Sequence, residues 1–197
     1  PLVTQDKVIF GAWDNTLYAL DKKDGTLAWK WFTCADKGMH YSPAAVWPVT
    51  AHGKVFIVDP ERAMTAIDLK TGKQLWRTYR SKVRESIGLS ADKKRIYAKT
   101  MQDSIVCYSA ESDSPQELWA TDVGFGYEHA TVMLPEKDGQ VFSSTKNGLI
   151  FALDAFTGQL LWSHKIGNTL VNTVVPINRK EVVYTNEDGW VGKLVSP

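Results

Sequence analysis

Residues 19–29 read ALDKKDGTLAW, and the same arrangement returns as AIDLKTGKQLW at residues 66–76 and as ALDAFTGQLLW at residues 152–162. In each copy an alanine is followed by any residue and an aspartate, then three residues and a glycine, then three residues and a tryptophan. With average residue usage, one chance match has a probability below about one in 10^5 per window. Three copies in one chain therefore indicate an internal repeat.

A fourth copy is altered but recognisable. Residues 105–109 read IVCYS, with Ser109 in place of the aspartate, and the closing tryptophan is Trp119. The tryptophans at positions 29, 76, 119 and 162 recur every 43 to 47 residues. A period of this length is typical of β-propellers, in which each repeat forms one blade.

The residues around each motif have the pattern of β-strands. In the first copy, residues 8–10 and 17–20 are apolar runs separated by a polar turn, which is typical of a hairpin. Gly25 is expected to supply a positive φ in the turn before a third strand at 26–32. A fourth strand is expected before each hairpin. The expected positions of these strands are residues 2–3, 44–49, 86–89, 131–134 and 173–176.

A single four-stranded sheet cannot bury both of its faces, so such sheets must stack side by side as blades. We therefore expect an all-β fold, a β-propeller of four-stranded antiparallel blades that form a single domain over residues 1–197. The last repeat stops before a glycine turn or a closing tryptophan, so four blades are complete and the fifth is partial. The expected blades span approximately residues 1–32, 42–80, 86–122, 131–166 and, for the partial one, 173–197.

The repeated motif resembles the tryptophan-docking motif of PQQ-binding-like (quinoprotein-like) propellers of the BamB type, and the resemblance covers essentially the whole chain. In that family each tryptophan packs across the seam between blades, near a glycine of the neighbouring motif. The resemblance therefore implies structural docking roles for Trp29, Trp76, Trp119, Trp162, Gly25, Gly72 and Gly158. Rings of this family usually have seven or eight blades, so the chain is expected to be part of a larger ring. Its open blade edges would favour edge-to-edge self-association of such a fragment.

The resemblance also suggests a quinone-dependent dehydrogenase, but the residues argue against that activity. The large alcohol dehydrogenases of the family carry a disulfide between adjacent cysteines, whereas Cys34 and Cys107 are far apart. Their calcium-binding set of Glu, Asn and Asp has no match here, and the four histidines stand singly. We therefore expect no catalytic residue, no cofactor and no metal in this segment. Cys107 stands where other repeats have alanine, which is typical of a buried free cysteine.

Charge and hydropathy exclude two kinds of partner. The 23 Lys and Arg residues nearly balance the 22 Asp and Glu residues, so the sequence gives no reason to expect nucleic acid. No apolar run approaches the roughly 18 residues that a membrane-spanning helix needs. The family resemblance, and nothing else in the sequence, places the protein in the periplasm or otherwise outside the cytoplasm.

Two classes of function stay open. The first is a non-catalytic scaffold that binds a protein, a peptide or a glycan through one face of the propeller. The second is part of a larger protein, either a quinone-dependent dehydrogenase whose cofactor residues lie elsewhere or a kinase-like or phosphoesterase-like protein with an accessory propeller.

A partner is expected to bind where the loops that enter the inner strands converge, because functional residues concentrate on loops. The hairpin loops between the second and third strands should share this face, adding Trp13, Asp14, Glu61 and Arg62. A mixture of aromatic, charged and polar groups suits polar recognition with an aromatic anchor. The alternative is that these groups only line a watery channel or pair with one another, as Arg84 could with Glu128. The candidate residues are His40, Tyr41, Arg84, Glu85, Tyr127, Glu128, His129 and Asn172.

Overall fold

The computed structural model describes residues 1–33, 46–125 and 133–196. These residues form nineteen β-strands in five antiparallel sheets. The all-β fold expected from the sequence is confirmed. Within the described residues, no helix is long and apolar enough to span a membrane.

Four sheets have four strands and the fifth has three, each in the order of the chain. Blade 1 consists of β1 (Leu2–Val3), β2 (Lys7–Gly11), β3 (Thr16–Asp21) and β4 (Leu27–Phe32). Blade 2 consists of β5 (Val49–Ala51), β6 (Lys54–Val58), β7 (Met64–Asp68) and β8 (Gln74–Thr78). Blade 3 consists of β9 (Val83–Leu89), β10 (Arg95–Thr100), β11 (Ser104–Ser109) and β12 (Glu117–Asp122). Blade 4 consists of β13 (Glu136–Lys137), β14 (Gln140–Ser144), β15 (Leu149–Asp154) and β16 (Leu160–Lys165). Blade 5 consists of β17 (Val171–Pro176), β18 (Glu181–Asn186) and β19 (Val191–Val195).

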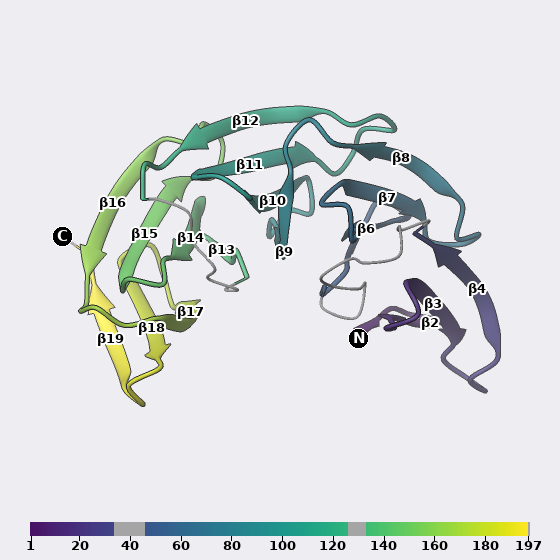
Figure 1. Cartoon of the computed structure of the whole chain (residues 1–197), viewed down its shortest axis with the longest axis horizontal. Helices are drawn as coiled ribbons and strands as arrows, with labels where there is room; N and C mark the ends of the chain where they lie inside the picture. The colour runs from purple at the N-terminus through teal and green to yellow at the C-terminus, as the bar shows by residue number, and fades with distance from the viewer. Residues whose placement is uncertain (34–45, 126–132, 197) are drawn as a thin grey trace.

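The blades follow one another around an open arc (Figure 1). Strands β4, β8, β12 and β16 lie along the convex outside of the arc, and β9, β13 and β17 lie toward its concave inside. Blade 1 forms one end of the arc and blade 5 forms the other. This radial arrangement of four-stranded sheets is that of a β-propeller.

The inner strands differ most from the sequence expectation. Strand β5 begins at Val49, where the expected strand 44–49 ends, and β9 begins at Val83, before the expected start at Ser86. Of the expected strand at 131–134, residues 131 and 132 lie outside the described residues and residues 133 and 134 are not in a strand, whereas the inner strand of blade 4 is Glu136–Lys137. In blades 1, 2 and 4 the inner strand has only two or three residues, too few to carry an alternating pattern.

The middle strands of the inner blades form the core. All five residues of β6 are buried, as are all six of β10 and all five of β14. Each of these strands lies between two neighbouring blades, so both faces of its sheet are covered. Strands buried on both faces have successive apolar residues rather than an alternating pattern, which explains the short apolar runs in the sequence.

Two seams between blades contain the expected docking of tryptophan on glycine. A Cβ atom on Gly72 would lie 2.7 Å from the Trp29 ring, and one on Gly158 would lie 2.5 Å from the Trp119 ring. The Trp29 indole N–H donates to the carbonyl of Leu69 at 2.9 Å. The tryptophan of one blade therefore lies flat on the turn of the next, as the family resemblance implies.

The seam between blades 2 and 3 is built differently. Ser109 replaces the motif aspartate and the turn after it carries no glycine. Instead, the Trp76 ring lies 6.5 Å from the Tyr108 ring, and both side chains belong to the same buried cluster. An aromatic contact therefore replaces glycine docking at this seam.

Candidate binding site

The structure describes only part of the candidate face. His40, Tyr41, Tyr127, Glu128 and His129 lie outside the described residues. The backbone of Glu85 lies in β9, but its side chain is outside the description, and Asn172 is exposed on β17. Arg84, also on β9, is only 5% exposed, so it packs inside the molecule and is not available as a surface contact.

The hairpin loops between the second and third strands do lie beside the connections between blades. The amide of Val83 donates to the carbonyl of Arg62, and the amide of Glu187 donates to the carbonyl of Leu170. The amide of Thr33 donates to the carbonyl of Asn15 in the same way. These backbone bonds place the two sets of loops on one face of the arc, which we call the loop face.

On the loop face of blade 2, the polar groups are used to hold the loop itself. The buried carboxylate of Asp59 accepts hydrogen bonds from the amides of Glu61 and Ala63, and from Arg77 at 2.5 Å. Arg77 also pairs with Glu61 at 2.8 Å, and the Tyr79 hydroxyl donates to Glu61. Burial and the hydrogen bond to Glu61 raise the pKa of Tyr79 to about 12. Glu61, which the sequence suggested as a binding residue, therefore contributes to loop structure.

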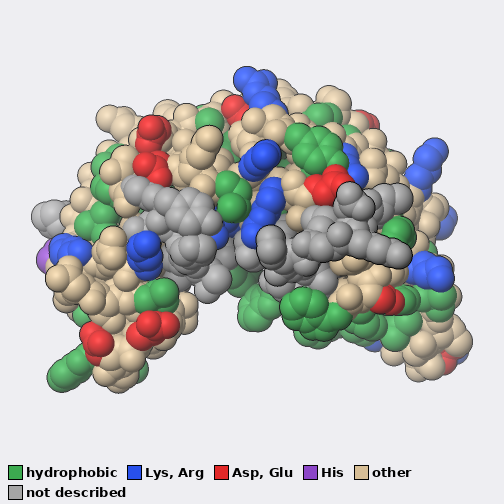
Figure 2. Space-filling view, viewed as in Figure 1, with side chains coloured by type: hydrophobic (Ala, Val, Ile, Leu, Met, Phe, Trp, Pro, Cys, Tyr) green, Lys and Arg blue, Asp and Glu red, His purple; other side chains and the backbone are tan. Residues whose placement is uncertain are grey.

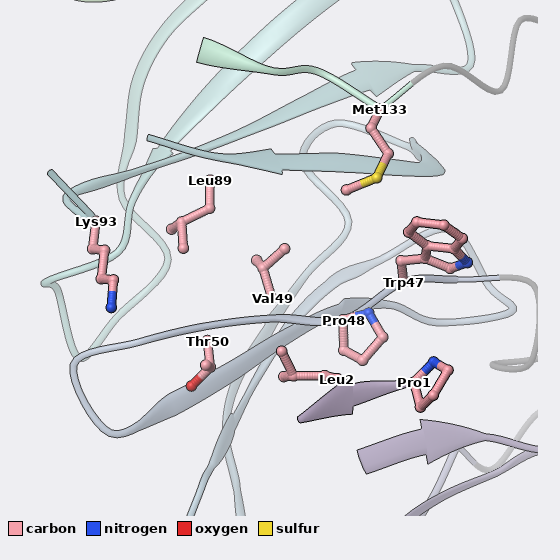
Figure 3. A pocket seen from close by; sticks show the side chains of 9 residues that line it. All are labelled: Pro1, Leu2, Trp47, Pro48, Val49, Thr50, Leu89, Lys93 and Met133. Atoms are coloured by element: carbon pink, nitrogen blue, oxygen red, sulfur yellow. The ribbon is translucent and has the colours of Figure 1, made fainter. Parts of the chain in front are cut away.

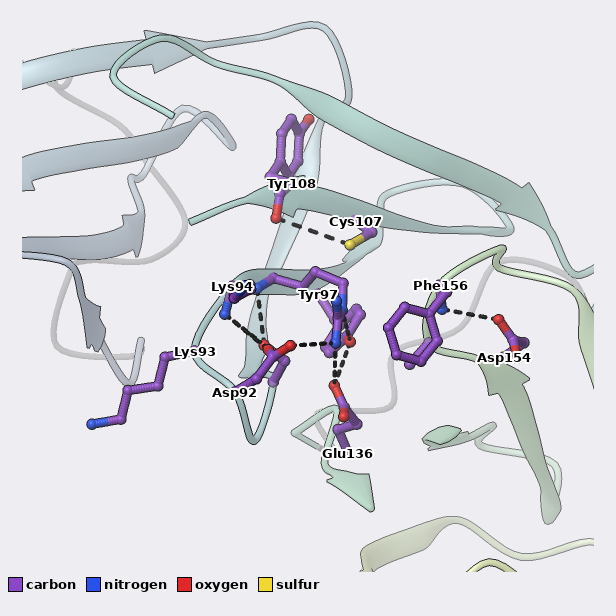
Figure 4. Close-up of polar contacts among 12 residues, drawn as sticks. Asp92, Lys93, Lys94, Tyr97, Cys107, Tyr108, Glu136, Asp154 and Phe156 are labelled. Atoms are coloured by element: carbon purple, nitrogen blue, oxygen red, sulfur yellow. Dashed lines mark hydrogen bonds and ion pairs between the residues drawn. The ribbon is translucent and has the colours of Figure 1, made fainter. Parts of the chain in front are cut away.

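A second polar cluster fastens blade 3 to blade 4. The Tyr97 hydroxyl donates to Glu136 and accepts a hydrogen bond from Arg95 at 3.0 Å (Figure 4). Arg95 also pairs with Asp92 at 3.1 Å, and its guanidinium lies 4.3 Å from the centre of the Phe156 ring. These groups satisfy one another across the seam, so we assign them to stability.

Cys107 lies near this cluster, and its environment makes it a poor nucleophile. The free thiol is fully buried, and burial raises its pKa. The thiolate is the reactive form of cysteine, so a thiol that stays protonated is unreactive as a nucleophile. This agrees with the expectation of a buried free cysteine. Within the described residues, no group of three or more His, Cys, Asp or Glu side chains could hold a metal ion.

An open pocket of about 410 Å³ lies on the concave side of the arc (Figure 3). We call it the inner-rim pocket. Its walls come from blades 1, 2 and 3 and from the segment that leads into blade 4. The lining residues are Pro1, Leu2, Trp47, Pro48, Val49, Thr50, Leu89, Lys93 and Met133.

Aromatic, proline and aliphatic groups dominate this pocket. Trp47 is 66% exposed and Met133 is 38% exposed, although both are large apolar side chains. The Thr50 hydroxyl donates to the carbonyl of Lys54, which leaves Lys93 as the charged side chain of the lining. The pocket can therefore accept an apolar group and offers few hydrogen bonds.

Neither Trp47 nor Met133 is among the binding residues expected from the sequence. Trp47 stands outside the docking register and directly before a proline, which is the one signal that could have separated it from the four structural tryptophans. No sequence signal brings it together with Met133, because the two residues belong to different repeats.

The comparison with protein families identifies the repeat. The family model described as outer membrane protein assembly factor BamB matches residues 1–126 and again residues 102–194. The chain belongs to this family. The fold of the BamB family is therefore established for the whole described arc.

Solved structures agree on the fold. BamB from Moraxella catarrhalis is 18% identical, with a TM-score of 0.77 over 98% of this chain and 59% of that one. A quinohemoprotein alcohol dehydrogenase from Pseudomonas putida is 23% identical, with a TM-score of 0.66 over 85% of this chain and 34% of that one. At such low identity these likenesses show the fold alone.

Among curated proteins, a tetrathionate hydrolase of Acidithiobacillus ferrooxidans is 26% identical over 172 residues, which cover 78% of this chain and 32% of that protein. The chain thus spans about a third of that relative and 59% of the Moraxella BamB chain.

Proposed function

We propose that this chain is a non-catalytic propeller scaffold that binds a protein or peptide partner by accepting an apolar side chain in the inner-rim pocket. The observation that carries the proposal is the pocket itself, in which Trp47 and Met133 stay exposed on walls drawn from several blades. Aromatic residues and methionine are enriched at protein interfaces, and a few anchors in well-packed pockets supply most of the binding energy.

The chemistry of the pocket favours a protein side chain over a glycan. A glycan site needs several polar groups that fix the sugar hydroxyls beside the aromatic ring. Here the Thr50 hydroxyl is already bonded to a backbone carbonyl, and Lys93 is the charged group that remains. The outer-membrane description of the family supports an extracytoplasmic location for this interaction.

Selection of peptides from a display library against the immobilised chain tests the proposal. For the peptides selected, Trp47→Ala should raise the dissociation constant at least about tenfold, because an interface tryptophan often contributes more than 1.4 kcal/mol of binding free energy. Trp190→Ala is the matched control, since Trp190 is 69% exposed and lies outside the pocket. Equal effects of the two substitutions, or failure to select any peptide sensitive to Trp47→Ala, would contradict pocket binding.

A second function, hydrolysis of tetrathionate, is favoured by the 26% identity to the Acidithiobacillus enzyme. The direct assay incubates the chain with tetrathionate and follows the sulfur products. Release of sulfur products from tetrathionate would replace the scaffold proposal with an enzymatic one. Dye reduction that depends on added quinone and calcium, the sign of a quinone-dependent dehydrogenase, would do the same.

A further inference from the structure

The two ends of the inner-rim pocket differ in chemistry. Lys93 is the charged side chain of the lining, and it lies at one end, whereas Trp47 and Met133 lie at the other, with Val49 between them (Figure 3). Figure 2 shows hydrophobic side chains along the concave edge of the arc, at the end that holds blade 1. One end of the pocket therefore suits an apolar group, and the other end presents a cation.

The backbone of its hairpin holds Lys93 in place. Lys93 lies in the turn between β9 and β10 with a φ of 62°, and its amide donates to the carbonyl of Ser90 at 2.9 Å. The carbonyl of Lys93 in turn accepts a hydrogen bond from Nε2 of His52, at 3.0 Å, in the turn that follows β5. Val49 and Thr50 of β5 line the pocket. The hydrogen bond between the two turns therefore keeps Lys93 beside the strand that lines the pocket.

The charge of Lys93 is not compensated by a neighbouring acid. Lys93 is exposed and makes no ion pair with any residue that the structure describes. The adjacent carboxylate of Asp92 accepts hydrogen bonds from the hydroxyl of Ser90 at 2.6 Å and from the amide of Lys94 at 3.0 Å. Asp92 also pairs with Arg95 at 3.1 Å. The nearest acid is thus engaged within its own turn, and the ammonium of Lys93 can pair with a carboxylate from a partner.

We infer that the inner-rim pocket selects an acidic peptide segment, in which an Asp or Glu that pairs with Lys93 stands about two to four residues from the apolar anchor. This inference rests on the proposed function and adds the chemistry of the partner to it. The spacing follows from β5, because Trp47 lies just before this three-residue strand and His52, which bonds to Lys93, lies just after it. An extended peptide advances about 3.3 Å per residue, as β5 does.

Lys93 is expected to determine specificity more than affinity. Complementary charges at an interface set the register of the partner and exclude wrong partners, and an exposed ion pair adds little binding free energy. The apolar anchor beside Trp47 supplies most of the affinity in this scheme. Removal of the pair should therefore weaken binding by a small factor and relax the choice of peptide.

The peptides selected against the immobilised chain supply the first test. Those whose binding depends on Trp47 should be enriched in Asp or Glu near the apolar anchor, relative to the unselected library. Replacing that acid by its amide should raise the dissociation constant about two- to fivefold, as expected for an exposed ion pair. Peptides that depend on Trp47 but show no such enrichment would overturn the inference and leave the proposed function intact. Failure to select any peptide that depends on Trp47 would overturn both.

Matched lysine substitutions provide the second test. Lys93→Gln should raise the dissociation constant about two- to fivefold at 0.1 M NaCl, and this difference from the wild type should vanish at 1 M NaCl, where charges are screened within about 3 Å. Lys94→Gln removes the same charge one residue away, outside the pocket lining, and should have little effect. Melting temperatures close to that of the wild type show that both variants are folded. Equal effects of the two substitutions would overturn the inference.

A charge exchange completes the test. Lys93→Glu should bind the selected acidic peptides more weakly than Lys93→Gln does, because repulsion replaces the lost attraction. A peptide with Lys in place of its acid should bind Lys93→Glu more tightly than it binds the wild type. If the exchanged peptide prefers the wild type, the acid of the peptide does not pair with Lys93 and the inference fails.

Discussion

At the scale of single residues, Gly72 and Gly158 are fixed by two demands at once. Each has a positive φ, which side chains other than glycine adopt at a cost, and each lies under an indole ring that leaves no room for a Cβ atom. Gly53 has a similar φ of 71° but open space around it. The comparison separates the backbone cost from the packing cost.

Gly72→Ala should therefore destabilise the protein more than Gly53→Ala. The backbone term is about 1–2 kcal/mol for each substitution, and the clash with Trp29 should add about 1–3 kcal/mol for Gly72→Ala alone. Urea unfolding of both variants and of the wild type measures the difference. Equal losses would show that the Trp29 ring moves aside at little cost.

At the scale of elements, the turn between the third and fourth strands of a blade is closed by its aspartate. The amide and the hydroxyl of Thr71 both donate to the carboxylate of Asp68, at 2.7 and 2.6 Å. The hydrogen bond from the Thr71 hydroxyl is the main reason that the pKa of Asp68 lies below its ordinary value. Thr157 makes the same two bonds to Asp154 in blade 4.

A lowered pKa in the folded state makes the turn sensitive to acid. The charged form of Asp68 stabilises the fold above the unfolded-state pKa of about 4, and this stabilisation is lost as the pH falls through the lower folded-state value. Asp68→Asn removes the titration, so its stability deficit should shrink as the pH falls below 4. Unfolding curves from pH 6 to pH 2.5 measure this trend. Asp188→Asn, on an exposed turn, controls for the change in net charge, and an identical trend in that control would refute the turn explanation.

At the scale of the whole molecule, stability should vary along the arc. Blades 2, 3 and 4 are covered on both faces, whereas blade 1 leaves Val3 and Leu27 more than half exposed and β19 has no fourth strand beside it among the described residues. In stacked repeats, each unit gains stability from its interfaces with its neighbours. The two end blades therefore hold fewer stabilising contacts.

Hydrogen exchange should show this gradient directly. Amides of β6, β7, β10 and β11 should exchange more slowly than those of β2 and β18, by more than about tenfold, because local opening free energies range from near zero to the global value. Exchange measured by mass spectrometry on peptides from each blade tests the prediction. A single exchange rate shared by all blades would indicate that the arc opens only as one unit.

Local patterns in the sequence determined the blades. Apolar runs such as residues 55–58 and 150–153, with a glycine turn and a tryptophan at fixed spacing, depend only on neighbours within one repeat. Strand, turn and docking glycine could therefore be predicted without knowing how the chain folds back on itself. The short inner strands could not, because Glu136 and Lys137 carry no pattern of their own and pair only where the blade leaves an edge for them.

Tertiary structure alone decided which groups are available for binding. Arg84 and Glu61 look like surface groups in the sequence, but the fold buries the first and a loop network engages the second. Trp47 looks like one more structural tryptophan, but it remains exposed on the wall of a pocket it shares with Met133, from a distant repeat. Burial and exposure depend on how blades from distant parts of the chain face one another, and no local spacing of residues encodes that contact.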